Sequence, residues 1–190
     1  KEVFGERALN IRPGLIVGPW DPTDRFTYWP VRIERGGKVL APGDPQYQIQ
    51  FIDARDLADW TIKIIEERVG GLFLAIGPEH PMTMGELLQT CLEVTQHKSE
   101  LVWVSEKELL AAEIAPWQEL PLWIPESSAE ASGMQKLDNR KAVGTGLGFR
   151  AVEDTVRDTL EWFHQHREGT ALRAGLDPQK EAETIEATIG

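Results

Sequence analysis

The chain has 190 residues, of which 41% are hydrophobic, and a formal net charge of −11. This length allows a single core, no apolar run approaches the length of a bilayer-spanning helix, and the acidic excess argues against nucleic acid as the main partner. The one cysteine, Cys91, excludes an internal disulfide framework and suits a reducing compartment, so we expect a cytoplasmic protein.

The first predicted strand covers Ala8 to Val17, whose nearly continuous apolar character is typical of a parallel strand covered on both faces. A loop with several prolines follows, and a helix is predicted from about Phe26 to Arg35, ended by Gly36 and Gly37. We expect a short strand around Val39. The alternating pattern of Gln48 to Ile52 predicts a further strand.

Capping residues mark the helices of the middle part. Asp53 is the expected N-cap of a helix from Ala54 to about Arg68. A buried strand is predicted from Leu72 to Ile76, and Gly77-Pro78 is expected to turn the chain out of this strand. Two capping boxes are predicted, Thr83 to Glu86 before a helix to about His97, and Ser105 to Glu108 after a strand from Leu101 to Val104.

The last third begins with an unusual stretch, Ala115 to Pro125. Its three prolines exclude a regular helix, yet it is too apolar to be a solvated linker, so we expect it to lie against the rest of the protein. Glu126 to Gly133 is predicted to be a loop. Ala151 to about His166 has the spacing of an amphipathic helix, and Asp177 with Pro178 predicts a final surface helix.

Several short motifs occur in a characteristic order. They are Arg12 to Gly18 (Arg-x-x-x-x-x-Gly), Phe51 to Ala58, Ala75 to Gly77, Met82 to Leu88, Asp138 to Ala142, and Leu147 to Phe149. In this order they resemble the C-terminal, substrate-side half of an extended short-chain dehydrogenase/reductase of the NAD-dependent epimerase/dehydratase family. The resemblance implies an α/β fold in which part of a Rossmann-like parallel sheet is joined to a small mixed α/β substrate-binding region. It covers residues 1–167, with 168–190 as a helical tail.

The resemblance also implies where the chemistry lies. Pro13, Gly14 and Leu15 match the segment beside the nicotinamide ring. The family's glycine-rich phosphate turn and its Tyr-x-x-x-Lys pair do not occur in this sequence, and the chain begins at Lys1 without an initiator Met. We therefore expect a piece of a parent enzyme that uses NAD or NADP. Its missing N-terminal half would be the partner of this chain, which would be inactive and bind no cofactor alone.

The substrate is expected to be a small molecule without a nucleotide. Nucleotide-sugar epimerases carry Asn and Arg where this chain has Leu15 and Ile49, and aliphatic side chains cannot satisfy phosphate oxygens. Aromatic residues in the loops predict a pocket for an apolar or ring-bearing substrate, although they could equally pack the core. The substrate-binding candidates are Leu15, Trp20, Arg25, Phe26, Trp29, Trp117 and Trp123.

Other interpretations stay open. Arg25 could bind an anion, but pairing with Asp21 or Asp24 is favoured. The spacing of His164 and His166 does not favour a metal site. The parent could also be a non-catalytic relative with a regulatory or RNA-binding role, or the chain a free-standing ligand-binding domain. An unpaired edge of the first strand would favour self-association into a homo-oligomer.

Overall fold

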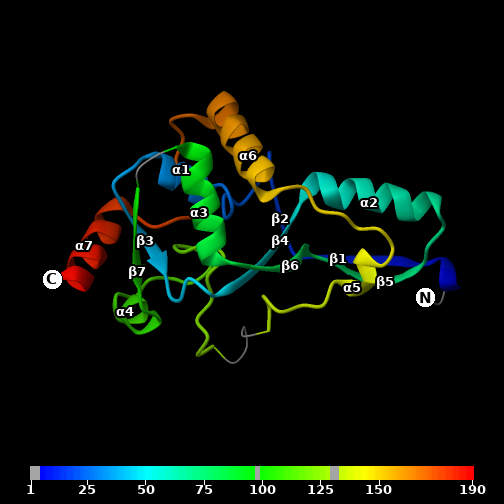
Figure 1. The fold of residues 1–190 in the computed structure, drawn as a ribbon, viewed down its shortest axis with the longest axis horizontal. Coiled ribbons are helices and arrows are strands. Elements are labelled where there is room, and N and C mark those ends of the chain that lie inside the picture. The colour runs from blue at the N-terminus through cyan, green and yellow to red at the C-terminus, as the bar shows by residue number, and fades with distance from the viewer. Residues whose placement is uncertain (1–4, 97–98, 129–132) are drawn as a thin grey trace.

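The computed structural model describes residues 5–96, 99–128 and 133–190, and Figure 1 shows them as an elongated α/β molecule with two lobes. One lobe holds β1 (Leu9–Pro13), β5 (Gly71–Ala75), α2 (Ala54–Glu66) and α5 (Arg140–Val143), beside the short 3₁₀ helix Gly5–Arg7. The other holds β3 (Lys38–Pro42), β7 (Glu100–Val104), α1 (Tyr28–Glu34), α4 (Glu106–Ala111) and α7 (Pro178–Ile189). Between them lie β2 (Leu15–Val17), β4 (Gln48–Asp53) and β6 (Gly77–Thr83), under α3 (Met84–Thr95) and α6 (Val152–Arg167).

The described strands form small sheets that are mainly parallel. β1 pairs with β5 and β3 pairs with β7, both in parallel, while β4 lies between parallel β2 and antiparallel β6. In the chain, α1 lies between β2 and β3, α2 between β4 and β5, and α3 between β6 and β7, so the strands that pair in parallel are joined by long crossover connections. The mixed α/β architecture with a partial parallel sheet confirms the predicted fold class.

The first predicted strand is broken, which corrects the expectation of one strand from Ala8 to Val17. β1 ends at Pro13 and β2 begins at Leu15, and the two pair with different partners, β5 and β4. The break falls at Gly14, where an added Cβ would lie 2.5 Å from the Cδ1 of Ile76. Because Ile76 occupies this space, the chain passes from one sheet to the next at a residue without a side chain.

The segment after Gly77-Pro78 is also corrected. It does not leave the sheet, because β6 begins at Gly77 and pairs antiparallel with β4. The register shifts between Ile49 and Phe51, so Gln50 lies in an irregularity of the ladder. Such bulges leave one backbone amide without a partner on the neighbouring strand.

The helix boundaries follow the capping residues closely. Thr83 and Glu86 form the predicted capping box of α3, Ser105 and Glu108 that of α4, and Asp177 caps α7 directly before Pro178. These motifs satisfy backbone amides that have no partner within the helix. They are local interactions, which is why the sequence predicts them.

Asp53 does more than cap α2. Its carboxylate accepts a hydrogen bond from the Arg55 backbone N–H at 2.9 Å, from the Arg55 guanidinium at 2.7 Å, and from the Thr155 hydroxyl of α6 at 2.9 Å. Burial raises the pKa of Asp53, but these hydrogen bonds outweigh it and hold the pKa below its ordinary value. The residue thereby joins α2 to α6.

Two large clusters of buried side chains lie on either side of the central strands. β4 contributes Ile49 and Phe51 to the larger cluster, and Ile52 to the smaller one around Trp60 and Phe73. Alternate residues of a strand point to opposite faces, so one short strand can serve both cores. Among the described residues, none of the helices combines the length and apolar character needed to cross a bilayer.

The proline-rich stretch and α7 both pack within the lobe that holds β3 and β7. Leu120, Leu122 and Trp123 are buried, so the stretch lies against the protein as expected. α7 contacts β3 and β7. It is less of a surface helix than predicted, since Glu181 and Ile185 are buried in that contact.

Candidate functional site

The junction between β1 and β2 carries the residues expected beside a nicotinamide ring. Pro13 is exposed, and Gly14 and Leu15 are half-buried. The Gly14 N–H donates to the Ala75 carbonyl at 3.2 Å, which fixes the backbone at the end of β5. The junction therefore lies partly exposed at the carboxyl end of a parallel strand, the place where open α/β sheets bind ligands.

One edge of β1 has no partner strand in the described part of the chain. Hydrogen bonds from Gly71 N–H to Ala8 and from Gly14 N–H to Ala75 mark the two ends of the β1–β5 ladder. Because alternate residues of a strand direct their N–H and C=O groups to opposite sides, Leu9 and Ile11 direct theirs to the open edge. This edge can accept a further strand.

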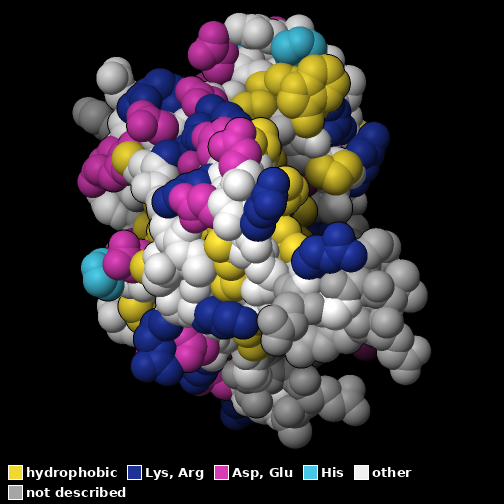
Figure 2. Space-filling model, turned by 90° about the vertical axis from the view of Figure 1, so that its right-hand side faces the viewer, with side chains coloured by type: hydrophobic (Ala, Val, Ile, Leu, Met, Phe, Trp, Pro, Cys, Tyr) yellow, Lys and Arg dark blue, Asp and Glu magenta, His cyan; other side chains and the backbone are white. Residues whose placement is uncertain are grey.

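One face of the β1–β5 pair is also open. Leu9 and Ile11 pack toward the core beneath α2, whereas Asn10 and Arg12 are exposed and Leu72 is 47% exposed. Parallel sheets are normally covered on both faces. Figure 2 looks onto this end of the molecule and shows hydrophobic side chains exposed between acidic and basic ones.

A cavity of about 510 Å³ lies between the start of β4 and the segments on either side of the loop after the proline-rich stretch. It has the size of an ordinary small-molecule pocket. Its lining is mostly polar, with one cation: Asp44, Gln46, Tyr47, Gln48, Ile124, Pro125, Glu126, Gln135 and Lys136.

Gln135 forms a fixed wall of this cavity. Its Oε1 accepts the N–H of Gln50 at 2.8 Å, and its Nε2 donates to the Leu122 carbonyl at 3.3 Å. The buried amide thus satisfies the backbone N–H that the bulge in β4 leaves unpaired. Sequence reasoning missed Gln135, since a glutamine in a polar run gives no signal for this role.

Tyr47 lines the same cavity as a neutral phenol. Burial raises the pKa of Tyr47, with Glu126 and Glu106 adding to the effect. Glu106 holds the adjacent loop, because its carboxylate accepts the backbone N–H of Glu126 at 2.7 Å and that of Ser127 at 3.2 Å. Hydrogen bonding by Ser127 is the main reason that the pKa of Glu106 is lowered.

Three of the predicted aromatic candidates lie in the core. Phe26 and Trp29 are fully buried and Trp123 is 1% exposed, and the Trp29 indole donates to the Pro121 carbonyl at 3.0 Å. Trp123 also borders another cavity, of about 530 Å³, beside Gly43. These contacts give the three rings a packing role.

Trp20 and Trp117 are the more accessible aromatic candidates. Trp20 is 71% exposed, and its ring packs against the surface of α6. Its ring centroid lies 5.2 Å from that of Trp162 and 5.6 Å from that of His166. Trp117 is half-buried in the proline-rich stretch. Neither of them lines the cavity around Tyr47.

Arg25 does not pair with the neighbouring aspartates, which corrects the favoured prediction. Its Nε donates to the Trp117 carbonyl at 3.1 Å, and its Nη2 donates to Gln118 at 3.2 Å. Asp21 instead accepts the Phe26 backbone N–H at 3.1 Å. Asp21 thus binds the backbone of its own loop and Asp24 binds Arg167, which leaves Arg25 to hold the proline-rich stretch.

Cys91 and the clustered glycines carry no site. Cys91 is fully buried, and burial raises the pKa of its thiol, so it stays protonated and unreactive. Gly144 and Gly146 lie in the turn that follows α5.

The sequence matches no protein-family model. It also matches no curated protein sequence. Solved structures do resemble the fold. A GDP-L-fucose synthetase from Naegleria fowleri bound to NADP aligns with a TM-score of 0.58 and 13% identity, over 85% of this chain and 48% of that chain.

Two further structures give the same result. A UDP-glucose 4-epimerase from Thermotoga maritima with UDP-glucose has a TM-score of 0.56 and 19% identity, over 83% of this chain and 46% of its own. The human epimerase family protein SDR39U1 with NADPH has a TM-score of 0.54 and 18% identity, over 80% of this chain and 47% of its own. The chain spans about half the length of these structures. It therefore has the fold of part of an extended short-chain dehydrogenase/reductase of the epimerase/dehydratase type.

Proposed function

We propose that this chain is the substrate-side half of an NAD(P)-dependent oxidoreductase or epimerase-like enzyme. The partner in this proposal is a segment that carries the glycine-rich turn and the Tyr-x-x-x-Lys pair. The observation that carries it is the open edge of β1, which ends at the Pro13–Leu15 junction. A strand added at this edge would continue the parallel sheet and cover the unpaired groups of Leu9 and Ile11.

The residues present fit one part of a dinucleotide. The partly exposed junction of Pro13, Gly14 and Leu15 would contact the nicotinamide side, where the bound cofactor supplies or accepts a hydride. The described residues hold no glycine-rich turn at the start of a helix that could receive the pyrophosphate. The proton relay and the phosphate cradle belong to the partner segment.

The proposed substrate is a non-nucleotide molecule with an apolar or ring-shaped body. Ile49 is fully buried, and Leu15 packs against the larger core, so neither position offers a donor to a diphosphate. The cavity around Tyr47 offers the phenol ring, Ile124 and Pro125 as contacts for a ring-shaped body, while its amides and the charged Asp44, Glu126 and Lys136 would bind the polar groups of the substrate. Small-molecule pockets commonly combine apolar contacts with a few placed polar groups in this way.

Hydride transfer tests the proposal. The 190-residue chain is titrated with NADPH and with NADH by calorimetry, and no saturable binding is expected. A longer form that adds the partner segment should bind one of the two and reduce a ring-bearing carbonyl probe, cyclohexanone or benzaldehyde. UDP-glucose should not inhibit it. Leu15→Asn in that form should weaken turnover of the probe, while Arg157→Gln, on the outer face of α6, should not.

Two results would overturn the proposal. Saturable NADPH binding by the 190-residue chain would show that no second half is needed. A longer form that binds neither nicotinamide coenzyme would show that the scaffold has another use.

A further inference from the structure

A second cavity lies at the far end of the molecule from the open strand edge. It has a volume of about 490 Å³ and is bounded by α7, the end of α1 and the start of β3. α7 and β1 stand at opposite ends in Figure 1. The cavity shares no lining residue with the cavity around Tyr47, so it is separate from the proposed substrate site.

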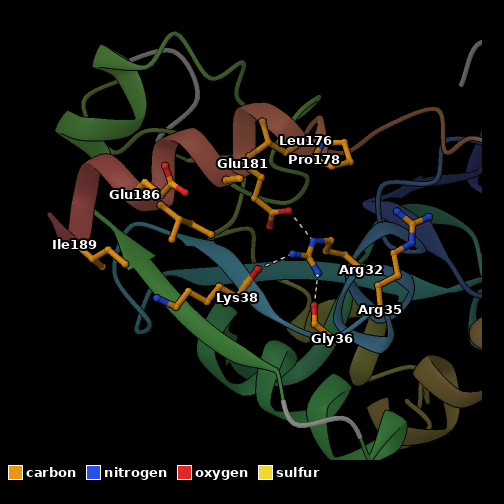
Figure 3. Close-up of a pocket in the computed structure, with 11 residues that line it drawn as sticks. Arg32, Arg35, Gly36, Lys38, Leu176, Pro178, Glu181, Glu186 and Ile189 are labelled. Atoms are coloured by element: carbon orange, nitrogen blue, oxygen red, sulfur yellow. Dashed lines mark hydrogen bonds and ion pairs between the residues drawn. The ribbon is translucent and has the colours of Figure 1, made fainter.

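The floor of this cavity is a fixed network around Arg32. Its Nε donates to the buried carboxylate of Glu181 at 2.7 Å, and its other nitrogens donate to the carbonyls of Gly36 at 3.1 Å and Lys38 at 2.6 Å. Glu181 also accepts the Leu40 N–H at 3.0 Å. Every strong charge on the floor is thus satisfied, and the network holds α7 against β3 (Figure 3).

One wall is an apolar stripe along α7. Pro178, Ala182, Ile185 and Ile189 recur at helical spacing and all line the cavity. At 1.5 Å per residue the stripe is about 16 Å long. Ile189 is 56% exposed at its far end, so the stripe is open to a long, narrow molecule.

The charges differ between the two ends. Figure 3 shows the Arg35 guanidinium on the Pro178 side of Arg32, whereas the Lys38 ammonium group extends toward Ile189. No ion pair joins either cation to another described residue. Glu186 lines the same trough on α7, and Figure 3 places it toward the Ile189 end. The Pro178 end is thus the more cationic one.

The lining as a whole carries one excess positive charge. Three cations stand against two carboxylates: Arg32, Arg35, Lys38, Glu181 and Glu186. The chain as a whole carries −11, so a positive lining is unusual on it. Asp177 already caps the first amides of α7, which leaves the Arg35 guanidinium as the partner for an anion at the Pro178 end.

We propose that this trough binds a linear amphipathic molecule with a single anionic group, such as a medium-chain carboxylate. The carboxylate pairs with Arg35 at the Pro178 end, and the hydrocarbon chain lies along Ala182, Ile185 and Ile189. One negative charge balances the excess charge of the lining, whereas a second one would meet Glu186. Burial of the chain against the stripe supplies the affinity, and the guanidinium supplies the orientation.

Decanoate is the probe, titrated into the 190-residue chain by calorimetry below its micelle concentration. Saturable binding is expected, with decanol at least about fivefold weaker because it lacks the charge. Arg35→Gln should weaken decanoate binding about fivefold to tenfold, and Lys38→Gln, at the other end, should change it less than twofold. Lys107→Gln on α4 removes the same charge outside the trough and should have no effect.

Ala182→Trp fills the trough and should abolish binding, with circular dichroism confirming that the variant is folded. Should this variant not fold, the contrast between Arg35→Gln and Lys38→Gln decides, because both positions are exposed. The proposal is overturned if decanoate shows no saturable binding. It is equally overturned if Arg35→Gln binds as tightly as the original chain.

Discussion

Asp24 is a buried charge whose replacement should be costly. It is fully buried in the loop before α1, its carboxylate pairs with the Arg167 guanidinium at the end of α6, and it accepts the Arg173 backbone N–H at 2.8 Å. Its φ of +59° lies in the left-handed region, which asparagine also tolerates. Asp24→Asn therefore removes the charge without adding backbone strain.

The expected loss follows from the two contacts. Arg167 and the Arg173 backbone N–H donate to different oxygens of the carboxylate, so in the carboxamide one of these two donors would face an NH2 group instead of an acceptor. Losing one charge-assisted hydrogen bond and weakening the other costs about 3 kcal/mol. For a chain of this length that corresponds to a fall in melting temperature of about 6–12 °C.

Urea and thermal unfolding measure this loss. Asp154→Asn is the matched control, because its partner Arg157 is 57% exposed at the side chain, and it should cost less than about 0.5 kcal/mol. A double-mutant cycle of Asp24→Asn with Arg167→Gln should show a coupling of more than about 1 kcal/mol. If Asp24→Asn unfolds within about 0.5 kcal/mol of the original chain, the buried pair does not stabilise the loop as argued.

Three further variants test other contacts. The pKa of Asp53 lies below its ordinary 3.8, because hydrogen bonds, mainly from Arg55, outweigh the effect of burial. The ionised carboxylate therefore contributes to the free energy of unfolding above pH 3.8, and this contribution is lost as the pH falls. In urea unfolding, the difference in stability between the original chain and Asp53→Asn should narrow from about pH 5 to 2. Gln135→Leu leaves the bulge amide of β4 unsatisfied and should cost about 1–3 kcal/mol, with faster exchange of that amide by NMR. Gly175→Ala should lower the free energy of unfolding by about 2–4 kcal/mol, because φ at this position is +124° and the added Cβ would lie 2.2 Å from the Tyr28 ring. An unchanged melting temperature would contradict this.

Local signals predicted the helices other than α5, and most strands. The capping boxes at Thr83 and Ser105 and the Asp53 cap lie within three residues of their partners, so the sequence displays both halves of each interaction. The break at Gly14 was different, because its cause is Ile76, far along the chain. No local pattern could show that contact.

The site was only partly predictable for the same reason. A motif predicts a role for the junction of Pro13 to Leu15, but the cavity around Tyr47 depends on Gln135, which reaches β4 across 85 positions. Arg25 likewise binds Trp117 and Gln118 rather than its neighbours. Aromatic residues at Phe26 and Trp29 give the same sequence signal whether they face a ligand or fill a core.

The paired strands between the two lobes limit how the lobes can move. β2 and β4 run from one lobe into the other as paired strands, and β4 places side chains in both cores. Bending one lobe against the other would have to break ladder bonds and open both interiors at once. The two lobes should consequently move as one rigid body. A ligand bound beside β2 and β4 would therefore meet a site whose shape does not change on binding.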